Sequence, residues 1–75
     1  MVIYGIEIGD NESGCETQEI MYRNYQDAKN KLMALVTARN LAMTERGDTS
    51  LLFKEVSPDC WRGSEFISIE TYELR

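Results

Sequence analysis

The chain has 75 residues, of which 43% are hydrophobic and 28% are charged, a composition far from the low hydrophobicity of disordered chains. A chain of this length forms one compact unit, so we expect a single domain spanning residues 1–75 with one small core. The formal net charge of −5 disfavours direct binding to nucleic acids, because their phosphates repel an acidic surface.

The first elements predicted along the chain form a hairpin. Residues 2–8 alternate between apolar residues on one face and Ile3 and Glu7 on the other, a pattern typical of a strand. Residues 9–16 are rich in turn-forming and acidic residues, so they are predicted to form a loop. Residues 19–22 are expected to return as a short second strand beside the first.

A long helix is predicted from Tyr25 to about Arg46. Asn24 is a good N-cap, Asp27 lies at the positive end of the helix dipole, and Gly47 supplies the C-terminal stop. At about 1.5 Å per residue such a helix is roughly 30 Å long. Projected at 100° per residue, one broad arc of its surface is apolar and is expected to face the core; it consists of Tyr25, Ala28, Leu32, Leu35, Val36, Ala38, Ala42 and Met43.

Two further strands are predicted after the helix. Residues 51–56 and 66–72 have strand-like patterns, and residues 57–63 between them have the composition of a long hairpin turn. The sequence therefore predicts an α+β fold, with a small antiparallel sheet in the order ββαββ and one long helix packed on one face.

The second half of the helix carries a candidate dimer interface. Strands of five or six residues span only about 17–20 Å, so the helix is expected to extend beyond the sheet. Arg39 lies within the apolar arc, whereas Ala34 and Leu41 lie together outside it. We expect these three residues to meet a second copy or another protein; the alternative is that Arg39 lays its stem on the core and extends its charge into water.

No constellation in the sequence predicts an enzyme, a metal site or a cofactor. Asp10, Glu12, Glu16 and Glu19 could gather Ca²⁺, but their spacing matches no EF-hand. The strand carboxylates Glu7, Glu55 and Glu70 are interpreted as outward-facing residues of a half-buried sheet. The glycines show no phosphate-binding pattern; they are Gly5, Gly9, Gly14, Gly47 and Gly63.

Cys15 and Cys60 are candidates neither for catalysis nor for zinc binding, because the chain contains no His. Both fall in predicted loops, so a disulfide between them stays open. The N-terminus lacks a basic segment followed by an apolar stretch, and we therefore expect a cytoplasmic protein with free thiols and no membrane segment.

Trp61 and Arg62 are expected at a loop tip, and Trp and Arg are the residue types most enriched at binding hot spots. The alternative is that Trp61 folds back and caps one end of the core.

The net charge is concentrated at one end of the sequence. Residues 1–22 contain five acids and no Lys or Arg, which leaves eight of the 13 acids and all 8 bases for residues 23–75. An acidic pole attracts basic surfaces. We therefore expect a non-enzymatic protein-binding module that presents one set of residues to a basic surface of another protein; the set is Asp10, Glu12, Glu16, Glu19, Trp61 and Arg62.

In its most specific form, this hypothesis describes an inhibitor that occupies the basic groove of a nuclease, a CRISPR effector or a transcription protein. Its carboxylates would take the places of the nucleic acid phosphates. Small acidic proteins of phages and mobile elements, such as anti-CRISPR and anti-restriction proteins, are similar in size and charge, although no motif carries the likeness. The alternative is a structural or scaffolding protein that self-associates through the helix, with the acids maintaining its solubility.

Overall fold

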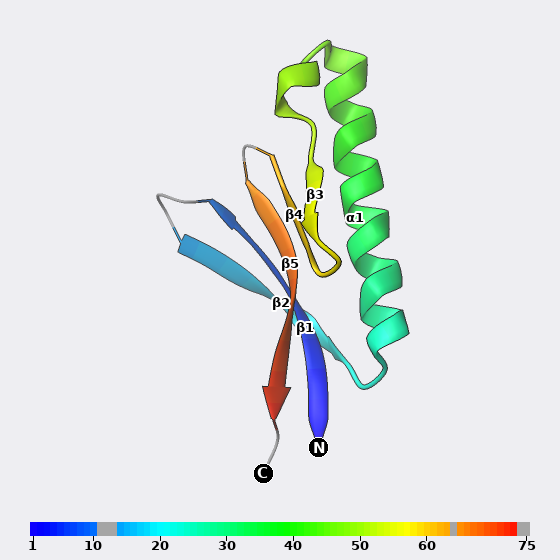
Figure 1. The fold of residues 1–75 in the computed structure, drawn as a ribbon, viewed down its shortest axis with the longest axis vertical. Helices are drawn as coiled ribbons and strands as arrows, with labels where there is room; N and C mark the ends of the chain where they lie inside the picture. Colours follow the sequence, from blue (N-terminus) through cyan, green and yellow to red (C-terminus); the bar gives the residue numbers. More distant parts are fainter. Residues whose placement is uncertain (11–13, 64, 74–75) are drawn as a thin grey trace.

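A computed structural model of the chain describes residues 1–10, 14–63 and 65–73, and for residues 10 and 14–20 it describes the backbone alone. Within these residues the elements follow the order β1 (Val2–Asp10), β2 (Gly14–Tyr22), α1 (Tyr25–Arg46), the short 3-10 helix η1 (Thr49–Leu51), β3 (Lys54–Ser57), β4 (Cys60–Arg62) and β5 (Phe66–Glu73). The strands form one antiparallel sheet in the order β2-β1-β5-β4-β3, and α1 lies along one of its faces (Figure 1). The predicted α+β class is confirmed, with five strands in place of four.

Both ends of α1 lie where the capping residues predict them. The side chain of Asn24 accepts a hydrogen bond from the N–H of Gln26 at 2.8 Å and so satisfies one of the free donors of the first turn. At the other end Gly47 adopts a left-handed conformation with a φ of 80°, and its N–H bonds to Thr44. A left-handed residue favours glycine, which explains why the helix stops at Arg46.

The first hairpin is longer than the sequence predicts. Residues 9–16 were expected to form a loop, but Gly9 and Asp10 belong to β1, and β2 begins at Gly14, with Gly9 opposite Cys15 and Asp10 opposite Gly14. The prediction was wrong because it relied on the polar composition of the segment. Backbone pairing in a hairpin continues up to the turn whatever the side chains are, provided that they are not required for the core.

The region between α1 and β5 also differs from the prediction. Residues 57–63 were expected to form one long turn, but Cys60–Arg62 is a strand that pairs with both β3 and β5. Leu51 lies in η1, and β3 begins only at Lys54. A strand of three residues is too short to show a period-two pattern, so composition could not reveal it.

The core lies between α1 and the sheet. Ala28, Leu32 and Val36 are each separated by one four-residue step along α1, and they pack on Ile6 of β1 and Ile67 and Ile69 of β5. Completely burying a side chain the size of Leu or Ile stabilises the fold by about 1.5–3 kcal/mol. Tyr25, Ala38 and Ala42 were expected in this stripe but are exposed, because the sheet contacts a narrower face of the helix than the predicted arc.

The C-terminal half of α1 is covered by the segment that follows it. Phe53 is only 3% exposed and Met43 only 8%, and the side chain of Asn40 holds the two segments together. Its Oδ1 accepts a hydrogen bond from the N–H of Phe53 at 2.7 Å, and its Nδ2 donates one to the Phe53 carbonyl at 3.3 Å. The part of the helix that extends past the sheet therefore rests on the chain's own residues (Figure 1).

Candidate protein-binding site

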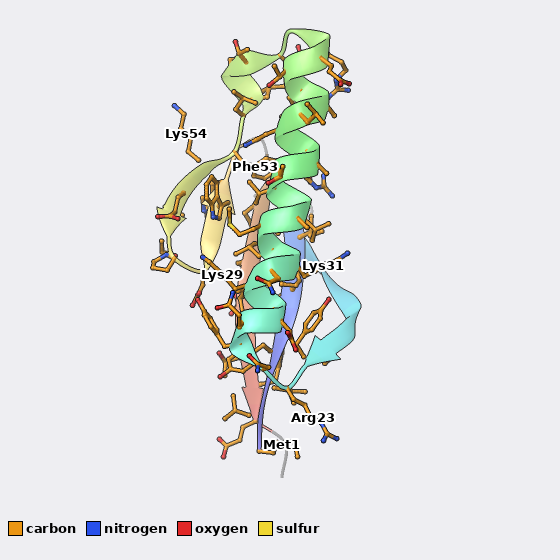
Figure 2. The ribbon with its side chains drawn as sticks, turned by 90° about the vertical axis from the view of Figure 1, so that its right-hand side faces the viewer. Met1, Arg23, Lys29, Lys31, Phe53 and Lys54 are labelled. Carbon is orange, nitrogen blue, oxygen red and sulfur yellow. The ribbon has the colours of Figure 1, made fainter. Side chains whose placement is uncertain are left out.

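Charge is divided between two parts of the fold. The adjacent strands β2, β1 and β5, here called the acidic half-sheet, carry two carboxylates each and no Lys or Arg. The bases of the described residues lie on α1, just before it, or on β3 and β4; they are Arg23, Lys29, Lys31, Arg39, Arg46, Lys54 and Arg62. Figure 2 labels Arg23, Lys29, Lys31 and Lys54 among them. The described acids of residues 1–22 therefore lie together on one side of the fold, and β5 adds two more acids to that side.

Two carboxylates of the acidic half-sheet point away from α1. Because Ile6 and Ile69 point into the core, the residues next to them along each strand point to the opposite face. We call this the open face, since none of the described helices covers it (Figure 1). Glu7 lies opposite Ser68 and Glu70 lies opposite Gly5, so the two carboxylates project from neighbouring strands on the open face.

Neutral hydroxyl groups hold these carboxylates in place. The Tyr72 hydroxyl donates a hydrogen bond to Glu7 Oε1 at 2.6 Å, and Ser68 Oγ donates one to Glu70 Oε1 at 3.1 Å. A neutral donor fixes the position of a carboxylate and leaves its charge intact. These hydrogen bonds fix the positions of the Glu7 and Glu70 carboxylates on the open face.

An apolar patch lies beside the two carboxylates. Met21 and Tyr72 cover Gly5, because a Cβ atom at Gly5 would lie 2.8 Å from Met21 Sδ and 2.9 Å from Tyr72 Cε2. Met21 nevertheless keeps 40% of its surface exposed, and the half-buried Ile3 lies opposite Tyr72 on the neighbouring strand. Glycine at position 5 therefore allows a flat apolar surface to form within the acidic half-sheet.

Three of the four predicted acidic residues lie on two strands of the acidic half-sheet. Asp10 ends β1, and Glu16 and Glu19 belong to β2, with Glu16 opposite Ile8. Asp10 and Glu16 are strand residues and not loop residues as expected, whereas Glu19 lies in the second strand as predicted. Glu12 lies outside the described residues. The structure thus brings Asp10, Glu16 and Glu19 into the half-sheet that also contains Glu7 and Glu70.

Trp61 and Arg62 do not form the predicted loop tip, because both belong to β4. Trp61 lies opposite Ile67 and packs half-buried against the core, as in the alternative reading of the sequence; its Nε1 is buried and has no hydrogen-bond acceptor among the described residues. Arg62 is exposed, with its guanidinium carbon 5.5 Å from the centre of the Phe66 ring. Since Phe66 pairs with both Arg62 and Gly9, Arg62 lies at the same end of the sheet as Gly9 and Cys15 of the first hairpin.

The two cysteines lie too far apart to form a disulfide within the chain. Cys15 belongs to β2 and Cys60 to β4, with β1 and β5 between them. Three interstrand spacings of about 4.8 Å place their Cα atoms roughly 14 Å apart, against about 4.4–6.8 Å in a disulfide. The Cys60 thiol is free.

The predicted dimer residues lie on the surface of α1. Arg39 Nη1 is 3.5 Å from Glu65 Oε2, an ion pair that links the helix to the segment before β5. Both side chains are more than a third exposed, so solvent weakens this pair and it contributes at most about 1 kcal/mol. Ala34 is exposed and Leu41 is 59% exposed. Self-association through these residues remains a prediction.

Sequence reasoning missed Glu70, Tyr72 and Met21 as members of one surface with Glu7. The alternation of β1 and β5 indicates that Glu7 and Glu70 point outward, but it does not show that these two strands are neighbours. That adjacency depends on the pairing of strands separated by more than 50 residues, for which the sequence holds no local signal.

Other kinds of site have no support among the described residues. No group of three or more His, Cys, Asp or Glu side chains is arranged there to hold a metal ion. The described part of the chain also contains no helix long and apolar enough to cross a membrane. Comparison with protein-family models, with curated proteins and with solved structures gave no match, so the function has to be inferred from the chain's own residues.

Proposed function

We propose that the chain is a non-enzymatic protein-binding module that docks a basic surface of another protein on the open face of its acidic half-sheet. The observation that supports this function is the pair of carboxylates Glu7 and Glu70 beside an apolar patch on the open face, on three adjacent strands that carry no base. The carboxylates would attract and orient the partner, and the apolar patch would supply surface to bury.

The carboxylates of the half-sheet would produce one electrostatic field because their strands are close together. Neighbouring strands are about 4.8 Å apart, whereas the Debye length is about 8 Å at physiological ionic strength. The potentials of charges on adjacent strands therefore add before salt screens them. A basic partner would experience the summed field of the half-sheet and not single ion pairs, each of which contributes little at a surface.

A narrower form of the proposal is an inhibitor whose carboxylates occupy phosphate sites on a nucleic-acid-binding protein, such as a nuclease or a CRISPR effector. A nine-residue strand is about 30 Å long, so the two carboxylates of the open face give one charge per about 15 Å, and all six of the half-sheet together give one per about 5 Å. Duplex DNA has one charge per about 1.7 Å and a single strand one per about 3.4 Å. The charge density of the half-sheet is therefore closer to that of a single strand than to that of a duplex, and the open face alone would replace only two phosphates.

A second candidate function is scaffolding by self-association through α1. Leu41, with 59% of its surface exposed, and the exposed Ala34 support it. Arg39 is already paired with Glu65, so a dimer that recruited Arg39 would have to replace that ion pair.

Affinity capture at two salt concentrations separates these functions. The tagged chain is used to capture proteins from a bacterial lysate at about 0.1 M and 1 M salt, where the Debye length falls from about 10 Å to about 3 Å. Recovery of one basic protein at low salt and its loss at high salt is the expected result. A dimer in light scattering that resists high salt, with no basic protein captured, would favour scaffolding and contradict the proposed function.

A further inference from the structure

The outer edge of β2 is a long strand edge that no described element covers. β2 pairs with β1 on one side, and it is the first strand in the sheet order, so its other side has no neighbouring strand (Figure 1). It contains nine residues, whereas β3 at the opposite edge contains four and is followed by Pro58. Short strands and prolines protect edges from pairing, so β3 is protected and β2 is not.

The part of β2 that can accept another strand is its first half. From Gly14 to Thr17 the pairing with β1 proceeds residue by residue, and the register then shifts before Met21. A bulge of this kind twists the edge and interrupts a ladder. The regular run Gly14–Thr17 contains neither Lys nor Pro, the two residues that most often block an exposed edge.

The open face alone is small for a stable complex. Three strands of about 30 Å at a spacing of about 4.8 Å cover roughly 400 Å², whereas a standard interface buries about 800 Å² on each partner. A partner that uses only this face would bind weakly. Contacts along the adjacent edge of β2 would enlarge the interface and add backbone hydrogen bonds.

We propose that an extended segment of a basic partner adds to β2 as a sixth strand, with its backbone paired to Gly14–Thr17. This inference rests on the proposed function and specifies how the partner binds. Charge determines the occupant: β2 carries Glu16 and Glu19 and no base, so a segment with Lys or Arg is favoured. Pairing with β2 of a second copy is disfavoured, because it would bring the glutamates of two copies together.

Two peptides of equal charge test this binding mode. The probe is a fluorescein-labelled decapeptide of alternating Lys and Val, and its control carries N-methyl groups on the two central residues. Adjacent residues of a strand point their N–H groups to opposite edges, so the control lacks a central donor on either edge. We expect the probe to bind at least tenfold more tightly than the control in fluorescence anisotropy, and to slow amide hydrogen exchange at Gly14–Thr17 but not at Lys54–Ser57.

The outcomes separate this inference from the proposed function. Equal affinity of both peptides, with binding that weakens at high salt and no protection of Gly14–Thr17, would overturn strand addition and leave the acidic half-sheet as the binding surface. Absence of salt-sensitive binding by either peptide would contradict both. A shift of the protein to a dimer in light scattering, with protection of Gly14–Thr17 in the absence of peptide, would replace the basic partner with a second copy.

Discussion

The Asn40→Ala variant tests whether the chain itself covers the C-terminal half of α1. The substitution removes both hydrogen bonds to Phe53 and leaves the N–H of that 3% exposed residue without its acceptor. An unsatisfied buried donor costs about 1–3 kcal/mol. A 75-residue domain has about 4–11 kcal/mol of total stability, so the loss is a large share of it. We expect a melting temperature lower by at least about 4–8 °C.

Asn30→Ala is the matched control for this variant. Asn30 is an exposed helix residue that accepts one hydrogen bond from Gln26 at 2.9 Å, a pair separated by four residues that contributes about 0.2–0.5 kcal/mol. Both variants gain the same helix propensity from Ala, so their difference in the free energy of unfolding, measured in urea, isolates the contacts of Asn40 with Phe53. Equal stability of the two variants would refute this account of how the helix end is held.

Three further predictions concern the core, a backbone contact and a tyrosine. Leu32→Ala should lower the free energy of unfolding by about 2–5 kcal/mol, because Leu32 is completely buried. Leu41→Ala, at an exposed position of the same helix, should change it by less than about 0.5 kcal/mol. Similar urea midpoints for the two variants would show that Leu32 is not a core residue. Gly63→Ala should lower the free energy of unfolding by about 1–3 kcal/mol, since the added Cβ would lie 2.7 Å from the backbone oxygen of Leu51, which cannot move aside. A variant with an unchanged melting temperature would contradict this contact. The hydrogen bond that Tyr25 donates to Asp59 raises the pKa of Tyr25 above its ordinary value of about 10, so its contribution to stability is present below pH 10 and disappears as the pH rises through the raised pKa. Tyr25→Phe should therefore be less stable than the wild type at pH 8, and this difference should disappear at a pH above the raised pKa of Tyr25. A stability difference that does not change with pH would argue against this bond.

The helix could be predicted from the sequence because its signals are local. Asn24 and Gly47 act on the turn next to them, and the structure places the helix ends at the expected residues. The width of its buried face was overestimated, since Tyr25, Ala38 and Ala42 are exposed. How much of a helix is buried depends on what packs against it, and that is not a local property.

The sheet was predicted less well because its determinants are not local. β4 contains only three residues, and its neighbours β3 and β5 hold it in place on both sides. The acidic strand ends of the first hairpin are stabilised by backbone pairing, which side-chain composition does not reveal. Strand order, which brings Glu70 of β5 next to Gly5 of β1, could not be obtained from composition or periodicity.

The candidate site was predicted in part. The concentration of acids in residues 1–22 is visible in the sequence, and it corresponds to two of the three strands of the acidic half-sheet. Trp61 was grouped with the acids as a binding residue, with packing on the core as the alternative, and it lies opposite Ile67 and packs against the core. Tyr72 is an aromatic residue of the open face, and it bonds to Glu7 across 65 positions of sequence.

The central claim is that the position of the acids, and not the net charge alone, produces binding. Two double variants that lose the same charge test it: Glu7→Gln with Glu70→Gln on the open face, and Asp27→Asn with Glu45→Gln on α1. Glutamine keeps an oxygen that can accept the hydrogen bonds of Tyr72 and Ser68.

The decisive measurement is the affinity of both double variants and the wild type for the labelled Lys-Val decapeptide at low salt. Two surface ion pairs of about 0.5–1 kcal/mol each correspond to a loss of about 5- to 30-fold. We expect this loss for the open-face variant and a change of less than about twofold for the helix variant. Equal losses for the two variants would show that binding follows net charge, and would contradict the assignment of the acidic half-sheet as the binding site.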